Sequence, residues 1–382
     1  MRSFVAVAVA LVLSSGAVEV RGEARASGLS RDSGSPSDSG LSSDNVEYVT
    51  TVPTEVGTAS GARLVGKYLY VAGAKSFSIY DVSDPEAPVL ESLTPTGPNF
   101  PNEDVDTNGK VLLLTDNTQS SELHVWDVED KGSPELLVTF ENLRDHTFSC
   151  MLGCRYAYGS RGTIVDLRRP AEAKIVGNWN PGLQQGDGFD VTEARRGMAV
   201  TSTRVLQLLD GRKDPTRPVL RAIGTTGDNR LLHSNRWPRE GRDRFLLVQG
   251  ETTIKPRCDE NSGAFMTWET RGWRKTHRFE MIDEYRVSNG LLVDGNPPAN
   301  VVGCTNMWFQ EHPTFSDGGL VAAAFFDHGT RFLNVDRRGQ ISEVGYFTPV
   351  GGQTISALWV TKDIAYAIDL TRGIDILRFS HR

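Results

Sequence analysis

The sequence of 382 residues has little cysteine and histidine and only one long apolar run, which lies near its N-terminus. No later segment approaches the roughly 20 apolar residues that a transmembrane helix needs, so we expect no membrane span in the mature chain. The net charge of -7 does not indicate a basic surface that would bind nucleic acid or an anionic membrane. The sequence contains no glycine-rich phosphate loop, no G-x-S-x-G elbow and no H-E-x-x-H. These absences weaken the nucleotide-binding and hydrolase hypotheses.

The N-terminal part is predicted to lie outside the folded domain. A basic residue is followed by the apolar run 4–13 and then by small residues, which is the pattern of a secretory signal peptide over residues 1–26. Residues 27–44 are mostly Ser, Gly and Asp with almost nothing to bury, so we expect a flexible leader. The sequence therefore predicts a secreted or extracytoplasmic monomer with a single domain over residues 45–382.

Glycine is the residue that organises this domain. It recurs at intervals of 43, 44, 44, 44 and 77 residues, each time between two short strand-like runs, and the same pattern returns without glycine at Lys362-Asp363. A repeat of about 40–45 residues made of short strands is typical of a β-propeller, because single blades cannot bury their faces alone. We therefore predict an all-β, seven-bladed β-propeller with four-stranded blades. The glycines are Gly66, Gly109, Gly153, Gly197, Gly241 and Gly318.

The last repeat lacks a fourth strand. It ends after its third run, residues 373–379, close to the end of the sequence. The first β-like run of the domain, residues 46–52, has no other partner. We expect it to pair beside the C-terminal strand, because this closes the ring and removes an exposed sheet edge.

The third run of many repeats ends in aspartate, and turns containing proline follow it. The best examples are Phe77-Ser-Ile-Tyr-Asp81 and Leu123-His-Val-Trp-Asp127, and the first continues as YDVSDPEAPVL. This pattern resembles the LVIVD-repeat family of extracellular β-propellers, over nearly all of residues 46–380. The resemblance implies the propeller fold and an exported setting. The family has no single activity, so the resemblance assigns no functional residue.

Four cysteines in an exported chain favour two disulfides over a metal site. Cys150 and Cys154 flank a three-residue turn and can meet across one hairpin. The 77-residue interval is longer than the others, and we expect the extra residues to form two loops of blade five within residues 251–304. Each loop carries one of the other cysteines, Cys258 and Cys304. A bridge between these two would pin both loops. A zinc site made by all four cysteines is the alternative.

The inner strand of each blade lines the central channel, and ligands of propellers usually sit at its mouths. The positions seven residues before the repeat glycines include Asn, His, Asp and Glu. These residue types suit a divalent metal or a polar ligand. The alternative is that water in the channel simply solvates them. Trp308 borders the insertion, and an exposed aromatic there would suit a ligand. The candidate ligand-binding residues are Asn102, Asp190, Trp308 and His328, and the candidate metal residues are His146, His233, Glu311 and His312.

One segment resembles the start of a calcium loop. Asp104-Val-Asp106-Thr-Asn108-Gly109 follows the D-x-D-x-N-G pattern, but the twelfth position is Thr115 rather than a bidentate glutamate. Asn-Gly is also the preferred dipeptide of a tight hairpin. We therefore interpret this segment as the turn of blade two.

Three functions remain open from the sequence. We expect an exported propeller that binds a small ligand or a protein partner at one mouth, with the blade-five insertions at its lip. The alternative is a metal-dependent enzyme of the oxidoreductase or lyase type, with a divalent metal and an axial His/acid site. A third possibility is a purely structural or cell-surface interaction module.

Overall fold

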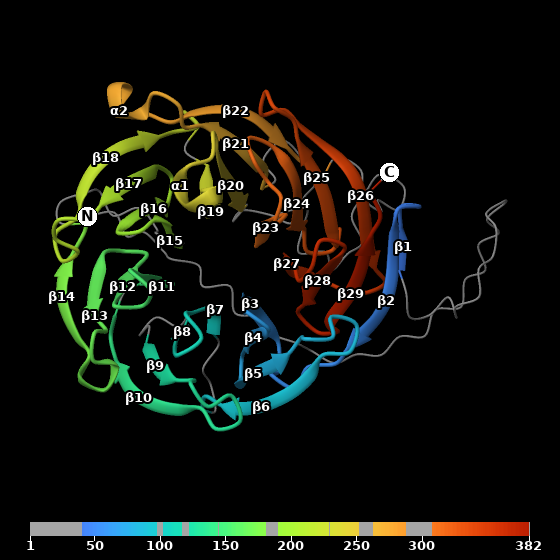
Figure 1. The fold of residues 1–382 in the computed structure, drawn as a ribbon, viewed down its shortest axis with the longest axis horizontal. Helices are drawn as coiled ribbons and strands as arrows, with labels where there is room; N and C mark the ends of the chain where they lie inside the picture. The colour runs from blue at the N-terminus through green and yellow to red at the C-terminus, as the bar shows by residue number, and fades with distance from the viewer. Residues whose placement is uncertain are drawn as a thin grey trace, which may run out of the picture. The chain divides into compact units, whose positions relative to one another are not determined.

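Seven antiparallel sheets surround a common centre in the computed structural model of the protein (Figure 1). The structure describes the following residues, all within the compact unit Pro36–Arg382: 40–97, 102–116, 122–143, 145–180, 190–228, 230–251, 263–287 and 308–381. The seven-bladed propeller predicted from the glycine intervals is confirmed. None of the helices in these ranges is long and apolar enough to cross a membrane.

The first three blades each take their four strands in sequence order from one region of the chain, and in each blade the first strand is the inner one. Blade 1 is β3 (Ala59–Val65), β4 (Tyr68–Gly73), β5 (Ser76–Asp81) and β6 (Val89–Pro95); blade 2 is β7 (Asn102–Thr107), β8 (Val111–Asp116), β9 (Leu123–Asp127) and β10 (Glu135–Phe140); blade 3 is β11 (Phe148–Met151), β12 (Tyr156–Gly159), β13 (Thr163–Asp166) and β14 (Lys174–Asn178), with the 3-10 helix η1 (Pro170–Glu172) before β14.

The remaining blades follow the same plan, and two short helices interrupt blade 5. Blade 4 is β15 (Asp190–Arg195), β16 (Met198–Ser202), β17 (Leu206–Asp210) and β18 (Val219–Gly224); blade 5 is β19 (Leu231–Arg236), α1 (Pro238–Gly241), β20 (Phe245–Glu251), β21 (Phe265–Glu269), α2 (Trp273–Thr276) and β22 (Glu280–Tyr285); blade 6 contains β23 (Phe309–Glu311), β24 (Gly319–Ala324), β25 (Thr330–Val335) and β26 (Ile341–Pro349); blade 7 contains β27 (Thr354–Trp359), β28 (Ile364–Asp369) and β29 (Gly373–Phe379).

The N-terminal strand β2 (Val46–Val52) completes blade 7. It pairs antiparallel with β29, from Val46 opposite Phe379 to Val52 opposite Ile374, and lies beside the C-terminal strands in Figure 1. The predicted ring closure is confirmed. Because β2 occupies the open side of β29, blade 7 contains strands from both ends of the described chain.

A further strand, β1 (Gly40–Ser42), was not expected. It pairs with β26 as a fifth strand of blade 6, with Gly40 opposite Pro349. The predicted leader of residues 27–44 therefore needs correction at its C-terminal end. The Ser, Gly and Asp composition of this segment did not indicate a strand. Glycine is needed at position 40, because a Cβ there would lie 2.2 Å from the carbonyl oxygen of Thr348.

The repeat glycines mark the hairpin that connects the inner strand to the second strand. All six have positive φ, between 60° and 118°, which L-residues with side chains rarely adopt. The Asn108-Gly109 segment is one of these hairpins, where the Asn108 side chain accepts the N–H groups of Lys110 and Val111. This turn geometry is why glycine recurs at the blade interval.

The recurring aspartate and proline also have structural roles. Asp81 and Asp166, at the ends of third strands, accept the backbone N–H of the residue two positions later and so fix the turn to the outer strand. The Tyr158 hydroxyl donates to the carbonyl of Pro215 in the next blade, 2.5 Å away, and Tyr366 donates to Pro85 in the same way at 2.6 Å. The Asp-Pro turn of one blade is thus held by the previous blade.

The hydrophobic core consists of seven clusters, one at each junction between neighbouring blades. At the junction of blades 1 and 2, for example, Tyr70 and Phe77 pack with Leu112 and Trp126. Each blade therefore depends on its two neighbours for burial, as expected for a closed repeat fold.

Candidate functional site

All seven blades line one cavity of about 530 Å³, where the inner strands end. Its walls include Ala62–Gly66 of blade 1, Asp104–Asn108 of blade 2 and Ser234–Arg236 of blade 5, with equivalent segments from the other blades. We call it the mouth cavity. Its volume lies within the range of small-molecule sites.

Carboxylates dominate the charge of the mouth cavity. Asp104, Asp106, Asp190 and Glu193 line it, whereas the lining cations are Arg63 and Arg236. An excess of one charge in a cleft with low-dielectric walls focuses the electric field and attracts the opposite charge. The mouth cavity is therefore acidic.

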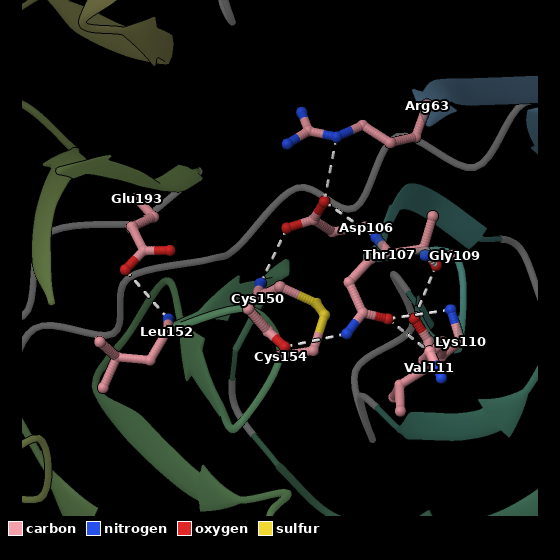
Figure 2. The surroundings of a disulfide bond; sticks show 12 residues. Arg63, Asp106, Thr107, Gly109, Lys110, Val111, Cys150, Leu152, Cys154 and Glu193 are labelled. Atoms are coloured by element: carbon pink, nitrogen blue, oxygen red, sulfur yellow. Dashed lines mark hydrogen bonds and ion pairs between the residues drawn. A yellow bond between two sulfur atoms is a disulfide. The ribbon is translucent and has the colours of Figure 1, made fainter. Parts of the chain in front are cut away.

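Most of these charged side chains also join neighbouring blades, as Figure 2 shows for blades 1 to 4. Arg63 Nε lies 3.1 Å from Asp106 Oδ1, and Asp106 Oδ2 accepts the N–H of Cys150 at 2.8 Å. Glu193 accepts the N–H of Leu152 at 2.9 Å. These contacts tie blade 1 to 2, blade 2 to 3 and blade 4 to 3.

The bridges continue on the other side of the ring. Asp190 accepts the N–H of Asn235 at 3.2 Å, which joins blades 4 and 5. Arg236 Nε donates to Glu311 at 2.6 Å, which joins blades 5 and 6. Gln310 accepts the N–H of Trp359 at 2.7 Å, which joins blades 6 and 7. Polar side chains thus bridge six blade junctions at or beside the mouth cavity.

Asp104 has the fewest partners of the acidic residues that line the mouth cavity. Among the described residues, no cation lies within ion-pair distance of its carboxylate, which accepts the N–H of the adjacent Val105. Burial raises the pKa of Asp104 well above its usual range, and the charges of Asp190 and Asp106 raise it further. Burial also raises the pKa of Asp190, to about 6. Asp190 and Glu193 also have no ion pair among the described residues, but each accepts a hydrogen bond from another blade, whereas the bond that Asp104 accepts comes from its own neighbour.

Two buried polar atoms of lining residues lack a hydrogen-bond partner among the described residues. They are Trp308 Nε1, a donor, and Asn235 Oδ1, an acceptor. The amide nitrogen of Asn235 is already used, because it donates to Ser202 Oγ at 2.7 Å. Buried polar atoms without partners cost free energy, so each favours a complementary group in a ligand.

The structure brings only some of the predicted site residues together. Asp190 and Trp308 line the mouth cavity, and Glu311 reaches its edge through the ion pair with Arg236. Asn102 is the first residue of β7, and its side chain lies outside the described part. Among the described residues, no three His, Cys, Asp or Glu side chains converge to hold a metal.

His312 is engaged at both ring nitrogens. Nε2 lies 2.9 Å from the carbonyl oxygen of Lys362, so it must carry the proton and donate. Nδ1 accepts from Thr314, through the hydroxyl at 2.7 Å and the backbone N–H at 3.2 Å. Burial lowers the pKa of His312, which keeps it neutral. No lone pair remains for a metal in this arrangement.

The other candidate histidines are not among the residues that line the mouth cavity. His146 precedes β11, where its backbone N–H donates to Ser160 Oγ at 3.0 Å. His233 is fully buried, with its ring 5.2 Å from that of Trp308. His328 lies in the turn before β25, and its carbonyl accepts from Thr348. The metal-dependent enzyme therefore stays a prediction. The described residues do not supply a set of side chains that could hold its metal.

The constant count of seven residues reaches the mouth cavity at Asp190 and Ser234 but not in every blade, because the inner strands contain β-bulges at different positions. β3 shifts register between Ala59 and Gly61, and β27 between Thr354 and Ser356. An extra residue turns the following side chains to the opposite face. Ala59 and Ile355, two counted positions, therefore lie in the hydrophobic core.

Sequence reasoning missed several residues of the mouth cavity, including Arg63, Glu193 and Arg236. It considered Asp104 and Asp106 only as the start of a calcium loop. The available signal was the presence of charged residues in the inner strands, just before the repeat glycines.

The predicted bridge between Cys150 and Cys154 is confirmed, with Cα atoms 4.3 Å apart (Figure 2). It closes a turn in which Leu152, Gly153 and Cys154 all have positive φ. Cys258 and Cys304, with the two loops of the predicted insertion, lie outside the described residues.

The Cys150–Cys154 bridge provides a stability prediction. Replacing both cysteines with serine should lower the free energy of unfolding by about 2 kcal/mol, because the bridge restricts the unfolded chain over a short loop. Chemical denaturation would measure this. Each single substitution should cost as much as the pair, since the bridge is lost in all three variants. An unchanged denaturation midpoint would show that the bridge contributes nothing to stability.

The sheets and the shared cavity define the class of the protein: it is a seven-bladed β-propeller with an acidic mouth. Residues 56–94, which cover all but the last residue of blade 1, match the model of the LVIVD repeat. The predicted resemblance to LVIVD-repeat propellers is thereby confirmed. No curated protein matches the sequence.

Several solved propellers have a similar structure. The WD40 repeats of RRP9 share 12% identity with a TM-score of 0.62, covering 90% of this chain and 100% of that chain. U3-55K shares 12% identity with a TM-score of 0.61, covering 88% and 98%. Raptor of Chaetomium thermophilum shares 10% identity with a TM-score of 0.59, covering 90% of this chain but only 29% of that longer chain. At such low identity, these similarities show the fold alone.

Proposed function

We propose that this protein is an exported binding propeller whose mouth cavity takes a small ligand with an amine or guanidinium group. The observation that carries the proposal is a cavity shared by all seven blades in which carboxylates outnumber cations, and in which Asp104 forms no ion pair with any described residue. A carboxylate that is partly removed from water and has no ion pair is costly, and a cationic ligand would supply a compensating charge.

Two other polar side-chain atoms belong to residues that line the same cavity. They are Asn235 Oδ1, an acceptor, and Trp308 Nε1, a donor, which are buried and have no partner among the described residues. The bridges between blades hold the surrounding side chains in place, for example through Arg63 and Asp106. A site whose groups are already positioned loses less entropy when it binds.

The proposed export depends on the signal-peptide pattern of residues 1–26. The disulfide between Cys150 and Cys154 supports it, because such bonds form and persist mainly in oxidising compartments. An export assay of the full chain, followed by mass measurement of the mature N-terminus, tests this part of the proposal.

Binding of a cationic probe should depend on pH. The groups that act on Asp104 are Asp106 and Asp190, which raise its pKa, and Arg63, which lowers it. A carboxylate with a raised pKa is protonated in mild acid, so its attraction for a cation appears only as the pH rises through that pKa. We therefore expect n-butylguanidinium to bind more tightly at pH 8 than at pH 5, as measured by isothermal titration calorimetry.

The matched variants are Asp104→Asn and Asp84→Asn. The first should weaken binding at pH 8 by about tenfold or more, since hydrogen bonds to charged groups contribute about 1.5–3 kcal/mol, and should flatten the pH dependence. The second removes an exposed turn carboxylate of blade 1 and should leave binding unchanged. Equal affinities of Asp104→Asn and the wild-type protein would refute the proposal.

A further inference from the structure

A second cavity, of about 360 Å³, lies where blade 4 meets blade 5, and its walls are rich in arginine. Arg195 at the end of β15 forms one side, the segment after α1 another, and Thr270–Arg274 a third. We call it the arginine hollow. Its lining residues are different from those of the mouth cavity.

Three arginines of this hollow have no carboxylate partner among the described residues. They are Arg195, Arg271 and Arg274, and all three are exposed. The other two lining arginines are paired: Arg242 lies 2.9 Å from Glu240, and Arg244 lies 2.7 Å from Glu269. The hollow therefore carries guanidinium charge that its neighbours do not neutralise.

The two lining aspartates hold the backbone of the hollow together. Asp243, 2% exposed, accepts the N–H of Phe245 at 2.9 Å and that of Asp317 at 2.8 Å. Asp317 accepts the N–H of Arg244 at 3.1 Å. Burial raises the pKa of Asp243, against the hydrogen bonds from Phe245 and Asp317. These carboxylates thus position the loop and leave the three arginines without a counter-ion.

Two tryptophans line the same hollow. Trp237 is buried; its Nε1 donates to the carbonyl of Asp243 at 2.8 Å, and its ring packs edge-on against Phe279. The Arg274 guanidinium lies 5.1 Å from the centre of the Trp273 ring, which helps to orient it. The two tryptophans thus add aromatic surface beside the guanidinium groups of the hollow.

We propose that the arginine hollow binds a phosphate or sulfate group. The guanidinium group presents several N–H donors in a planar fork that matches the oxygens of such anions. The proposal does not depend on the function of the mouth cavity, which attracts the opposite charge. The structure thus assigns two separate sites to a chain with a net charge of -7.

The test titrates the purified protein with inorganic sulfate and with inorganic phosphate at constant ionic strength, against chloride as the control anion. Tryptophan fluorescence and calorimetry report binding. We expect saturable binding of sulfate or phosphate but not of chloride. The double variant Arg195→Gln/Arg271→Gln should bind about tenfold more weakly and keep its unfolding temperature, since both side chains are exposed.

The matched control is Arg169→Gln, an exposed arginine of blade 3 that pairs with Glu172. It should bind sulfate and phosphate like the wild-type protein. The proposal is overturned if the wild-type protein shows no saturable binding of either anion. It is also overturned if Arg169→Gln loses as much affinity as the double variant, because this would indicate general charge screening.

Discussion

Deletion of residues 46–52 is expected to prevent the propeller from folding. These residues form β2, whose pairing with β29 supplies the outer strand of blade 7. Val46 is 4% exposed and packs with Phe347 and Phe379, so the deletion also opens the core between blades 6 and 7. The unpaired edge of β29 would promote aggregation. The loss should exceed the whole stability of a typical domain, about 5–15 kcal/mol.

Circular dichroism and denaturant unfolding test this deletion. The truncated protein should lack a cooperative unfolding transition or form aggregates. The matched control starts the chain at Asn45, which removes β1 but keeps β2. It should fold, because β1 adds only three residues at the outer edge of blade 6 and Leu41 is 51% exposed. A cooperative, soluble protein without residues 46–52 would show that β2 does not close the ring.

Asp106→Ala is expected to be the most destabilising single substitution in the mouth cavity. Asp106 is 6% exposed and joins three blades, through the ion pair with Arg63 and the hydrogen bond from Cys150. Its removal leaves a buried N–H without an acceptor and a guanidinium without its partner. We expect a loss of about 3 kcal/mol in the free energy of unfolding, with a lower unfolding temperature.

Two controls separate the contributions at this position. Asp106→Asn keeps an acceptor for the Cys150 N–H but loses the charge, so its loss should be smaller. Glu129→Ala removes an exposed ion pair with Lys110 and should change stability by less than about 1 kcal/mol. If Asp106→Ala unfolds at the same denaturant concentration as the wild-type protein, the bridges at the mouth do not hold the blades together.

The blade number and the ring closure could be predicted because they depend on local rules. A hairpin that needs positive φ selects glycine, as at Gly109 and Gly197, and so the blade interval is visible in the sequence. The closing strand could be recognised because blade 7 lacks a fourth strand and Val46–Val52 has no other partner. The strand β1 was not predicted because it has only three residues and its one apolar side chain, that of Leu41, is exposed.

The site was harder to predict because it depends on contacts between distant residues. The inner-strand bulges change which side chains face the channel, so a fixed count reaches a core residue in blade 1, Ala59. Glu311 could be recognised as a charged residue near the channel, but its partner Arg236 lies 75 positions away. The arginine hollow likewise combines residues of different blades, and sequence spacing does not show their proximity.

The most direct test of the acidic mouth is a crystal structure of the protein soaked with n-butylguanidinium at pH 8. We expect electron density for the probe in the mouth cavity, with a guanidinium nitrogen about 3 Å from a carboxylate oxygen of Asp104. Density for the probe at another place, or a mouth cavity that contains only solvent at saturating probe, would contradict it.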